Sequence, residues 1–305
     1  MRHRLSVLVI VLAVVAAGPL AVERPLPNRP DSVKFAVIGD NGTGDQPQYD
    51  VANQMALARA AFPFDLVIML GDNFYGSQRP KDLVKKFEQP YKLLLDGGVT
   101  FHAAIGNHDD PATIDYAPLN MNGRRYYAFT RGPVRFFVLD TNQLDREQVA
   151  WFREALAESG ELLNIAYFHH PLYSNAGRHG SAVDLRVILE PLLVQHGVNV
   201  VFSGHDHSYE RVKPQKGIHY FVAGSGGKLR RGGVEPSDQT ASAFDQDQAF
   251  MLVEVAGQEL FFQTISRTGA TVDGGVIPNR NVTRLTENAG VGYGSVTTDV
   301  ERRIP

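Results

Sequence analysis

Five short apolar segments of this sequence run directly into residues that can bind a metal ion. The groups that follow them are, in chain order, Asp40-Asn41-Gly42, Gly71-Asp72-Asn73-Phe74-Tyr75, Gly106-Asn107-His108-Asp109, His169-His170-Pro171 and Gly204-His205-Asp206-His207. They contain carboxylates, amides, imidazoles and a phenol, which as a set suit Fe, Zn or Mn. The sequence has no cysteine, so thiolates are excluded as ligands and as nucleophiles.

The position of these groups predicts that they converge. In α/β sheets, sites form at the carboxyl ends of strands, because the loops from separate strands meet there. Four of the five groups contain or follow a glycine, which lets the backbone turn sharply and approach closely. A single Gly-Asp after a strand is usually a turn or a helix cap. Five such groups, each at a strand end, indicate one shared site instead.

Strands alternate with amphipathic helices from about Val33 onward. The expected strands are Lys34–Ile38, Asp65–Leu70, Thr100–Ile105, Ile165–Phe168 and Val198–Phe202. The expected helices are Tyr49–Ala61, Lys81–Leu95, Asp145–Ser159 and Val183–His196. A hairpin is expected over Tyr126–Asp140, and Gly217–Ser266 is rich in strands. The pattern predicts an α/β fold, a four-layer α-β-β-α sandwich of two mixed sheets flanked by helices.

The composition is typical of a folded globular enzyme, and the first residues resemble a secretion signal. The 305 residues are 43% hydrophobic and 21% charged, which suffices for one large core. Residues 1–21 combine a basic head, an apolar run and a small-residue exit, as in a secretory signal peptide. An uncleaved membrane anchor is the alternative, but the run is shorter than the ~20 residues that span a bilayer. We therefore expect a catalytic domain over residues 32–275, a loosely ordered tail over 276–305, and a secreted or periplasmic location without membrane association after cleavage.

The charge of the sequence indicates that a phosphate group would be recognised at a confined site and not by a broad basic surface. The formal net charge is -3, which offers no broad basic surface for nucleic acid. The segment Gly224-Ser225-Gly226-Gly227 lacks the Lys-Ser/Thr pair and the following helix of a P-loop. We interpret this segment as a turn at a strand end.

The five groups resemble the motifs of the calcineurin-like metallophosphoesterases, and among these the purple acid phosphatases of the tartrate-resistant type. The family pattern is Asp-x-Gly, Gly-Asp-x-x-Tyr, Gly-Asn-His-Asp/Glu, a strand that ends in His, and Gly-His-x-His. All five motifs are present between residues 40 and 207. The likeness to the purple subgroup depends on Tyr75, because other members of the superfamily lack this tyrosine. Ala166 stands where the fourth motif usually has valine, which concerns strand packing only.

The resemblance implies two metal ions that share the carboxylate of Asp72. The implied ligands are Asp40, Asp72, Tyr75 and His207 for the first ion, and Asp72, Asn107, His169 and His205 for the second. A bridging carboxylate suits two ions about 3.5–4 Å apart. The phenolate and carboxylates favour Fe(III) at the first position, whereas the amide and imidazoles suit divalent Fe, Zn or Mn at the second.

Two further histidines are candidates for catalysis. His108 is expected to bind phosphate or to protonate the leaving group. His179 follows the His169 strand by about ten residues and resembles a substrate-contacting histidine of the family. A surface histidine is the alternative interpretation of His179.

Three neighbouring residues receive structural interpretations. His170 is expected to point away from the site, because side chains alternate along a strand, and to support a ligand or the fold instead of binding metal. Asp109 and Asp206 are expected to orient the ligand imidazoles.

The predicted function is that of a secreted acid phosphatase, which hydrolyses phosphate monoesters by attack of a metal-activated hydroxide at a dinuclear Fe(III)–M(II) centre. The expected substrates are phosphate esters of small molecules or phosphoproteins. A phosphodiesterase or nucleotide phosphohydrolase with two divalent ions is the alternative within the same chemistry. A non-catalytic metal- or phosphate-binding module is a third class, but the complete ligand set and His108 argue against it.

Overall fold

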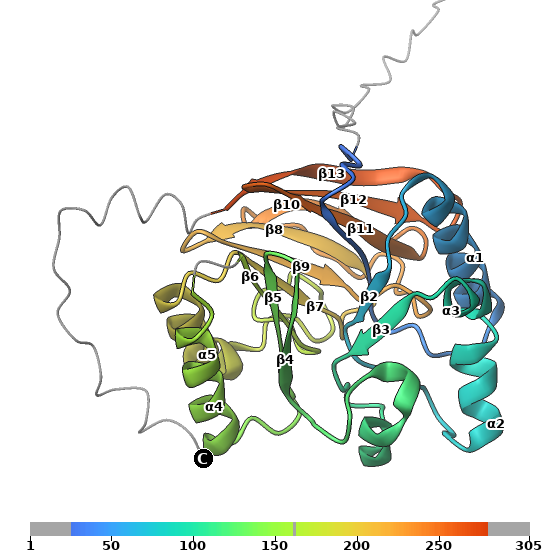
Figure 1. Ribbon diagram of the computed structural model, residues 1–305, viewed down its shortest axis with the longest axis horizontal. Helices are drawn as coiled ribbons and strands as arrows, with labels where there is room; N and C mark the ends of the chain where they lie inside the picture. Colours follow the sequence, from blue (N-terminus) through green and yellow to red (C-terminus); the bar gives the residue numbers. More distant parts are fainter. Residues whose placement is uncertain (1–25, 161–162, 280–305) are drawn as a thin grey trace, which may run out of the picture.

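The computed structural model describes residues 26–160 and 163–279, which form two packed β-sheets with helices on the outside (Figure 1). The first sheet has the strand order β13-β12-β11-β1-β2-β3. Its strands are β1 (Val33–Ile38), β2 (Leu66–Met69), β3 (Thr100–Ala103), β11 (Ala249–Ala256), β12 (Glu259–Ser266) and β13 (Thr271–Pro278). Strand β1 is parallel to β2, which is parallel to β3, and β11 is antiparallel to β1. The first sheet is therefore mixed.

The second sheet has the strand order β10-β8-β9-β7-β6-β5-β4. Its strands are β4 (Tyr127–Arg131), β5 (Val134–Val138), β6 (Leu163–Tyr167), β7 (Val200–Ser203), β8 (Tyr209–Gln215), β9 (Ile218–Ala223) and β10 (Thr240–Phe244). Strands β5, β6, β7 and β9 run parallel, and β4 pairs with β5 as the predicted hairpin. Each sheet thus has neighbouring parallel strands whose carboxyl ends lie on one edge.

The helices cover the two outer faces (Figure 1). The first sheet is accompanied by α1 (Gln46–Ala61), α2 (Pro80–Leu83), the π-helix η1 (Val84–Glu88) and α3 (Lys92–Asp96), and the second sheet by α4 (Arg146–Ala157) and α5 (Val183–Gln195). Two short 3-10 helices, η2 (Pro111–Asp115) and η3 (Ala117–Leu119), follow β3. This arrangement confirms the predicted four-layer sandwich. The single helix expected over Lys81–Leu95 is wrong: the chain breaks near Pro90, which has no N–H to donate.

Alternation along the strands separates two apolar cores. In β6, Ile165 and Tyr167 belong to the core between the sheets, whereas Ala166 belongs to the core beneath α4 and α5. Between the sheets, Phe35 of the first sheet meets Phe136 of the second edge to face, with ring centroids 5.3 Å apart. Strands buried on both faces explain why their sequences are continuous apolar runs. This packing fixes the strand ends relative to one another.

The last strand of the first sheet runs past residue 275, the expected end of the catalytic domain. Strand β13 continues to Pro278, and Ile277 is buried in the core between the sheets. Residues 276–278 therefore belong to the sheet instead of the expected tail, because Ile277 adds apolar burial. The expected signal peptide and the remainder of the expected tail lie outside the described residues. Within the described ranges, the helices are too short or too polar to cross a bilayer.

Candidate dinuclear metal site

The structure brings all seven predicted metal ligands to one edge of the sandwich, where the loops after five parallel strands meet. The ligands and the strands that they follow are Asp40 (β1), Asp72 and Tyr75 (β2), Asn107 (β3), His169 (β6), and His205 and His207 (β7). The first four come from one sheet and the last three from the other. The site therefore exists only when both sheets are packed together.

One half of the cluster consists of oxygen ligands and one imidazole. Single ligand atoms of Asp40, Asp72 and His207 all lie within 4.8 Å of one another. The Tyr75 hydroxyl lies 3.0 Å from Asp40 Oδ1 and 3.1 Å from His207 Nε2. The phenol of Tyr75 is thus part of the cluster and does not merely pack beside it.

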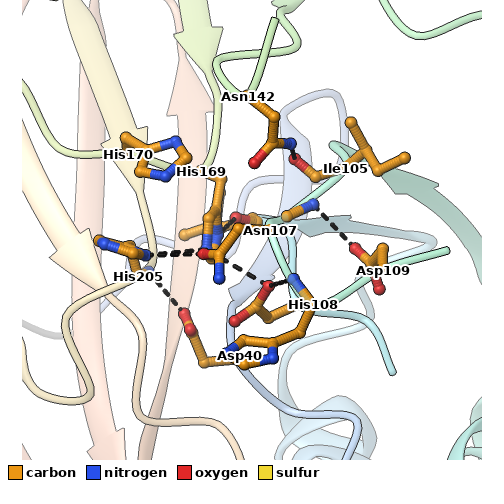
Figure 2. A network of polar contacts seen from close by, with 12 residues as sticks. Asp40, Ile105, Asn107, His108, Asp109, Asn142, His169, His170 and His205 are labelled. Carbon is orange, nitrogen blue, oxygen red and sulfur yellow. Dashed lines mark hydrogen bonds and ion pairs between the residues drawn. The ribbon is translucent and has the colours of Figure 1, made fainter. Parts of the chain in front are cut away.

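The other half consists of an amide and two imidazoles (Figure 2). The Oδ1 atom of Asn107 lies 3.0 Å from His169 Nε2 and 3.0 Å from His205 Nδ1. The two imidazole nitrogens are 3.2 Å apart. His169 Nε2 is also 3.4 Å from Asp72 Oδ1. Asp72 therefore adjoins both halves, as a bridging carboxylate would.

The donor atoms of this second half fit a cation. His169 Nδ1 lies 2.9 Å from the carbonyl oxygen of Leu70, which can only accept, so Nδ1 bears the proton. His169 Nε2 then presents a lone pair to Asn107 Oδ1, which is also an acceptor. Two lone pairs 3.0 Å apart repel each other unless a positive charge lies between them. The backbone contact to Leu70 is the kind of support that orients metal-bound histidines.

The electrostatics of the pocket also favour bound cations. Burial raises the pKa of Asp40 well above its usual range, and the Asp72 carboxylate raises it further. Burial and the same two carboxylates raise the pKa of Tyr75. Burial lowers the pKa of His205 to about 2, which keeps its lone pair available. A bound metal ion reverses the cost of the buried negative charges.

Glycines in the motifs allow the loops to cross in contact. A Cβ at Gly42 would lie 1.8 Å from the carbonyl oxygen of Asn73. A Cβ at Gly106 would lie 2.1 Å from the backbone nitrogen of Asp72. The glycines of these two motifs therefore make room for the loop that holds Asp72.

Three ligands have left-handed backbone conformations, which cost about 1–3 kcal/mol each in a residue with a side chain. The φ angles are 54° at Asp40, 52° at Asp72 and 70° at His205. Hydrogen bonds across the site hold these conformations: the His205 N–H donates to Asp40 Oδ2 at 2.8 Å. The His108 N–H donates to Asp72 Oδ1 at 2.9 Å. The ligand carboxylates thus also fix the loops.

Both predicted catalytic histidines lie at the rim of the cluster. The ring of His108 is 4.8 Å from the ring of Tyr75, centroid to centroid. The ring of His179 is 4.2 Å from the ring of His205. Both side chains are exposed, so a substrate on the metals could reach them. Their catalytic roles stay predictions.

His170 borders the site and does not point away from it, whereas its contacts fit the expected supporting role. Its ring lies 4.4 Å from that of His205, so it borders the site (Figure 2). Strand β6 ends at Tyr167, and strand alternation does not extend to His170. Its Nδ1 atom contacts the hydroxyl of Thr141 at 2.9 Å. The sequence signal that could have located His170 is its position next to His169 at the end of a strand.

The two neighbouring carboxylates accept hydrogen bonds from loop residues and not from the ligand imidazoles. Asp109 accepts hydrogen bonds from the N–H groups of Gly106 and Phe74 and from the side chain of Asn73. Asp206 accepts one from the Ser174 hydroxyl at 2.7 Å. The expectation that these residues orient ligand imidazoles is therefore wrong, because their oxygens are engaged by loop donors.

A cavity of about 520 Å³ adjoins the amide half of the cluster, next to Asn107 and His170. Arg125 lines it, but its guanidinium is paired with Asp140 at 2.7 Å and with Asp145 at 2.9 Å. The guanidinium that lines this cavity is therefore already neutralised.

Comparison with known proteins agrees with this site. Residues 33–209 match the model of the calcineurin-like phosphoesterase family, which is more than half of the chain. The chain belongs to this family. A dinuclear metal centre is typical of it, and the cluster of Asp40, Asp72 and His207 is a candidate for part of such a centre.

Within this family, the chain is similar to acid phosphatases. The chain is 26% identical to tartrate-resistant acid phosphatase type 5 of Oryctolagus cuniculus over 238 residues, 64% of this chain and 73% of the relative. It is 24% identical to the Homo sapiens protein of the same name over 301 residues, 82% of this chain and 92% of the relative. These similarities confirm the resemblance to purple acid phosphatases and the prediction of a metal-dependent phosphoric monoester hydrolase.

Solved structures confirm the fold. A purple acid phosphatase from yellow lupin (Lupinus luteus) seeds superposes with a TM-score of 0.65 at 18% identity, over 85% of this chain and 56% of that chain. A dimetal phosphatase from Danio rerio gives 0.64 at 16% identity, over 81% and 99%. GAP50 of Plasmodium, described as the anchor in the inner membrane complex, gives 0.70 at 18% identity, over 88% and 98%.

Replacing Asp72 with alanine is expected to remove both metal ions, because its carboxylate adjoins both halves of the cluster. Inductively coupled plasma mass spectrometry of the desalted protein measures the metal content. Asp110→Ala, an exposed carboxylate in the same loop region, is the matched control and keeps its metals. Full metal content in Asp72→Ala would disprove the bridging assignment.

Proposed function

We propose that this chain is a secreted acid phosphatase, which hydrolyses phosphate monoesters of small molecules or phosphoproteins at an Fe(III)–M(II) centre, with Fe, Zn or Mn as the divalent ion. The observation that supports it best is the position of Tyr75. Its hydroxyl lies between Asp40 and His207 at hydrogen-bond distance from both. An anionic phenolate beside a carboxylate is a hard oxygen set, which favours a trivalent ion.

When bound, two such ions supply Lewis acidity, which activates water and neutralises phosphoryl oxygens. The chain's own residues orient this chemistry. Asp40, Asp72, Tyr75 and His207 would hold the first ion, and Asn107, His169 and His205 would complete the second position with Asp72. Asn107 is exposed although the histidine it contacts, His169, is fully buried, so this half faces the solvent from which the substrate arrives.

His108 and His179 lie at the rim of the cluster, where one can donate a proton and the other can contact the substrate. His108 lies beside Tyr75, and His179 lies beside His205, so the two imidazoles border the two halves of the cluster. We assign His108 the role of protonating the leaving alkoxide, and His179 that of contacting the phosphate. Desolvation and the charge of Arg178 lower the pKa of His179, so its cationic form is populated only in acid. This direction supports activity at acidic pH.

Secretion or a periplasmic location is supported by residues 1–21 alone. Their basic head and apolar run have the pattern of a cleaved export signal. The substrates that the charge pattern favours are esters recognised at the metal site, because the sequence offers no broad basic surface for nucleic acid.

The visible absorption spectrum of the metal-loaded protein tests the proposed centre. A broad visible band with two metals per chain, at least one of them iron, is expected from tyrosinate bound to Fe(III). Tyr75→Phe is expected to lose the band while keeping the fold. Tyr116→Phe, a phenol outside the cluster, is the control and keeps the colour. A colourless protein with two zinc or manganese ions would refute the Fe(III) assignment and favour the diesterase alternative.

His108→Ala is expected to retain both metals and to lose about 100-fold or more in kcat for phenyl phosphate, because the leaving phenolate lacks its proton donor. The loss should be smaller for para-nitrophenyl phosphate, whose leaving group needs less protonation. Steady-state kinetics with both esters measures this difference. An unchanged kcat for phenyl phosphate would assign the proton to another group.

A further inference from the structure

Gln78 joins the loop after β2 to the loop after β3, which carries His108. The side-chain nitrogen of Gln78 donates to the carbonyl oxygen of His108 at 2.9 Å. Its side-chain oxygen accepts hydrogen bonds from the Asp110 N–H at 3.1 Å and from the Thr113 hydroxyl at 2.9 Å. A longer contact of 3.4 Å joins the same nitrogen to the carbonyl oxygen of Phe74. These contacts use both donors and both acceptor positions of the amide.

The backbone of His108 is held on both sides by residues of the loop after β2. Its N–H donates to Asp72 Oδ1 at 2.9 Å, and its carbonyl oxygen accepts from Gln78. Within residues 26–160 and 163–279, the imidazole nitrogens of His108 form no hydrogen bond. The exposed imidazole instead lies beside the ring of Tyr75, with the ring centroids 4.8 Å apart. The backbone contacts therefore set the place of this side chain.

The loop that carries Gln78 is itself anchored. Lys86 of the π-helix η1 is buried, and its ammonium donates hydrogen bonds to the carbonyl oxygens of Tyr75 and Ser77. The Tyr75 N–H donates to the carbonyl oxygen of Gly42, in the loop after β1, at 2.9 Å. Gln78 thus extends from a fixed segment, and a fixed support can orient the residue that it binds.

The position of a proton donor decides which esters are hydrolysed well. A general acid must lie within hydrogen-bond reach of the leaving oxygen, and a displacement of about 1 Å can cost about 100-fold in rate. The cost is largest for esters whose leaving oxygen is strongly basic, such as those of aliphatic alcohols. Esters with a stabilised leaving group, such as nitrophenolate, need little protonation and lose less.

We infer that Gln78 is a positioning residue for His108, which holds the imidazole beside Tyr75 and thereby extends the substrates to monoesters with strongly basic leaving groups. Gln78 acts through the backbone of His108 and not on the substrate. This inference rests on the proposed function, because it concerns the proton donor of that reaction.

Steady-state kinetics of Gln78→Ala with two esters tests this role. The variant is expected to retain its metals and to lose about tenfold in kcat for phenyl phosphate, with a smaller loss for para-nitrophenyl phosphate. Gln89→Ala is the matched control and keeps both values, because this exposed glutamine contacts Tyr49 instead. Equal losses for the two esters would overturn the inference, since a general disturbance of the fold or of the metals affects both.

Gln78→Glu separates the bond to His108 from the other contacts. A carboxylate keeps the acceptor contacts to Asp110 and Thr113, but it cannot donate to the carbonyl oxygen of His108. At about pH 6.5, where glutamate is ionised, the variant is expected to show the same selective loss for phenyl phosphate. The wild-type ratio of the two kcat values would overturn the inference. Because glutamate has the shape of glutamine, this variant decides the question if Gln78→Ala does not fold.

A double-mutant cycle distinguishes positioning from a separate structural effect. If Gln78 acts only through His108, the Gln78→Ala/His108→Ala variant is expected to hydrolyse phenyl phosphate as fast as His108→Ala alone. A further loss of about tenfold in the double variant would show independent effects and would contradict the positioning role.

Nuclear magnetic resonance of the zinc-loaded protein gives a readout that does not need activity. The ring protons of His108, assigned by their absence in His108→Ala, are expected to be shifted by the neighbouring Tyr75 ring. In Gln78→Ala they are expected to move toward the values of an exposed histidine without an aromatic neighbour. Unchanged resonances would refute the inference while the proposed function stands. A wild-type protein that hydrolyses neither ester refutes the proposed function, and the resonances still decide on the position of His108.

Discussion

Mutual repulsion among electron-rich side chains is the constraint on which this structure depends. Two carboxylates, a phenol, an amide oxygen and three imidazoles are held within a few ångströms, and the Asp72 carboxylate adjoins both halves of the set. Such a set is unfavourable without cations. The sandwich must therefore hold the loops against this repulsion before metal binds, and the bound cations then stabilise the folded state.

The two sheets provide that rigidity. Strands buried on both faces, with aromatic contacts such as Phe35 against Phe136, fix where each strand ends. The loops add local constraints of their own. The left-handed φ angles of Asp40 and Asp72 are held by hydrogen bonds that end on the ligand carboxylates, so the site stabilises its own strained backbone. Glycines such as Gly42 and Gly106 let the loops touch.

Much of this arrangement can be predicted from the sequence, because the ends of the strands have a recognisable residue pattern. An apolar run followed by Gly-Asp or Gly-His locates both the strand and its ligand, and the shared sheet edge implies convergence. The helix break near Pro90 was predictable from proline alone. The position of His170 could not be predicted, because it depends on strand β6 ending at Tyr167. The hydrogen bonds of Asp109 could not be predicted either, because one of their donors is the backbone of Phe74, in the loop after β2. Lys228 lies more than 150 residues from Tyr75 in the sequence, and only the tertiary structure places its charge over that ring.

The proposed chemistry depends most on two metal ions that share Asp72. Anomalous diffraction from crystals of the metal-loaded protein, collected on both sides of the absorption edges of iron, zinc and manganese, locates the ions directly. We expect two peaks about 3.5–4 Å apart with Asp72 between them. One ion should contact Tyr75 and the other Asn107. A single peak, or a second peak that does not touch Asp72, would contradict the dinuclear assignment.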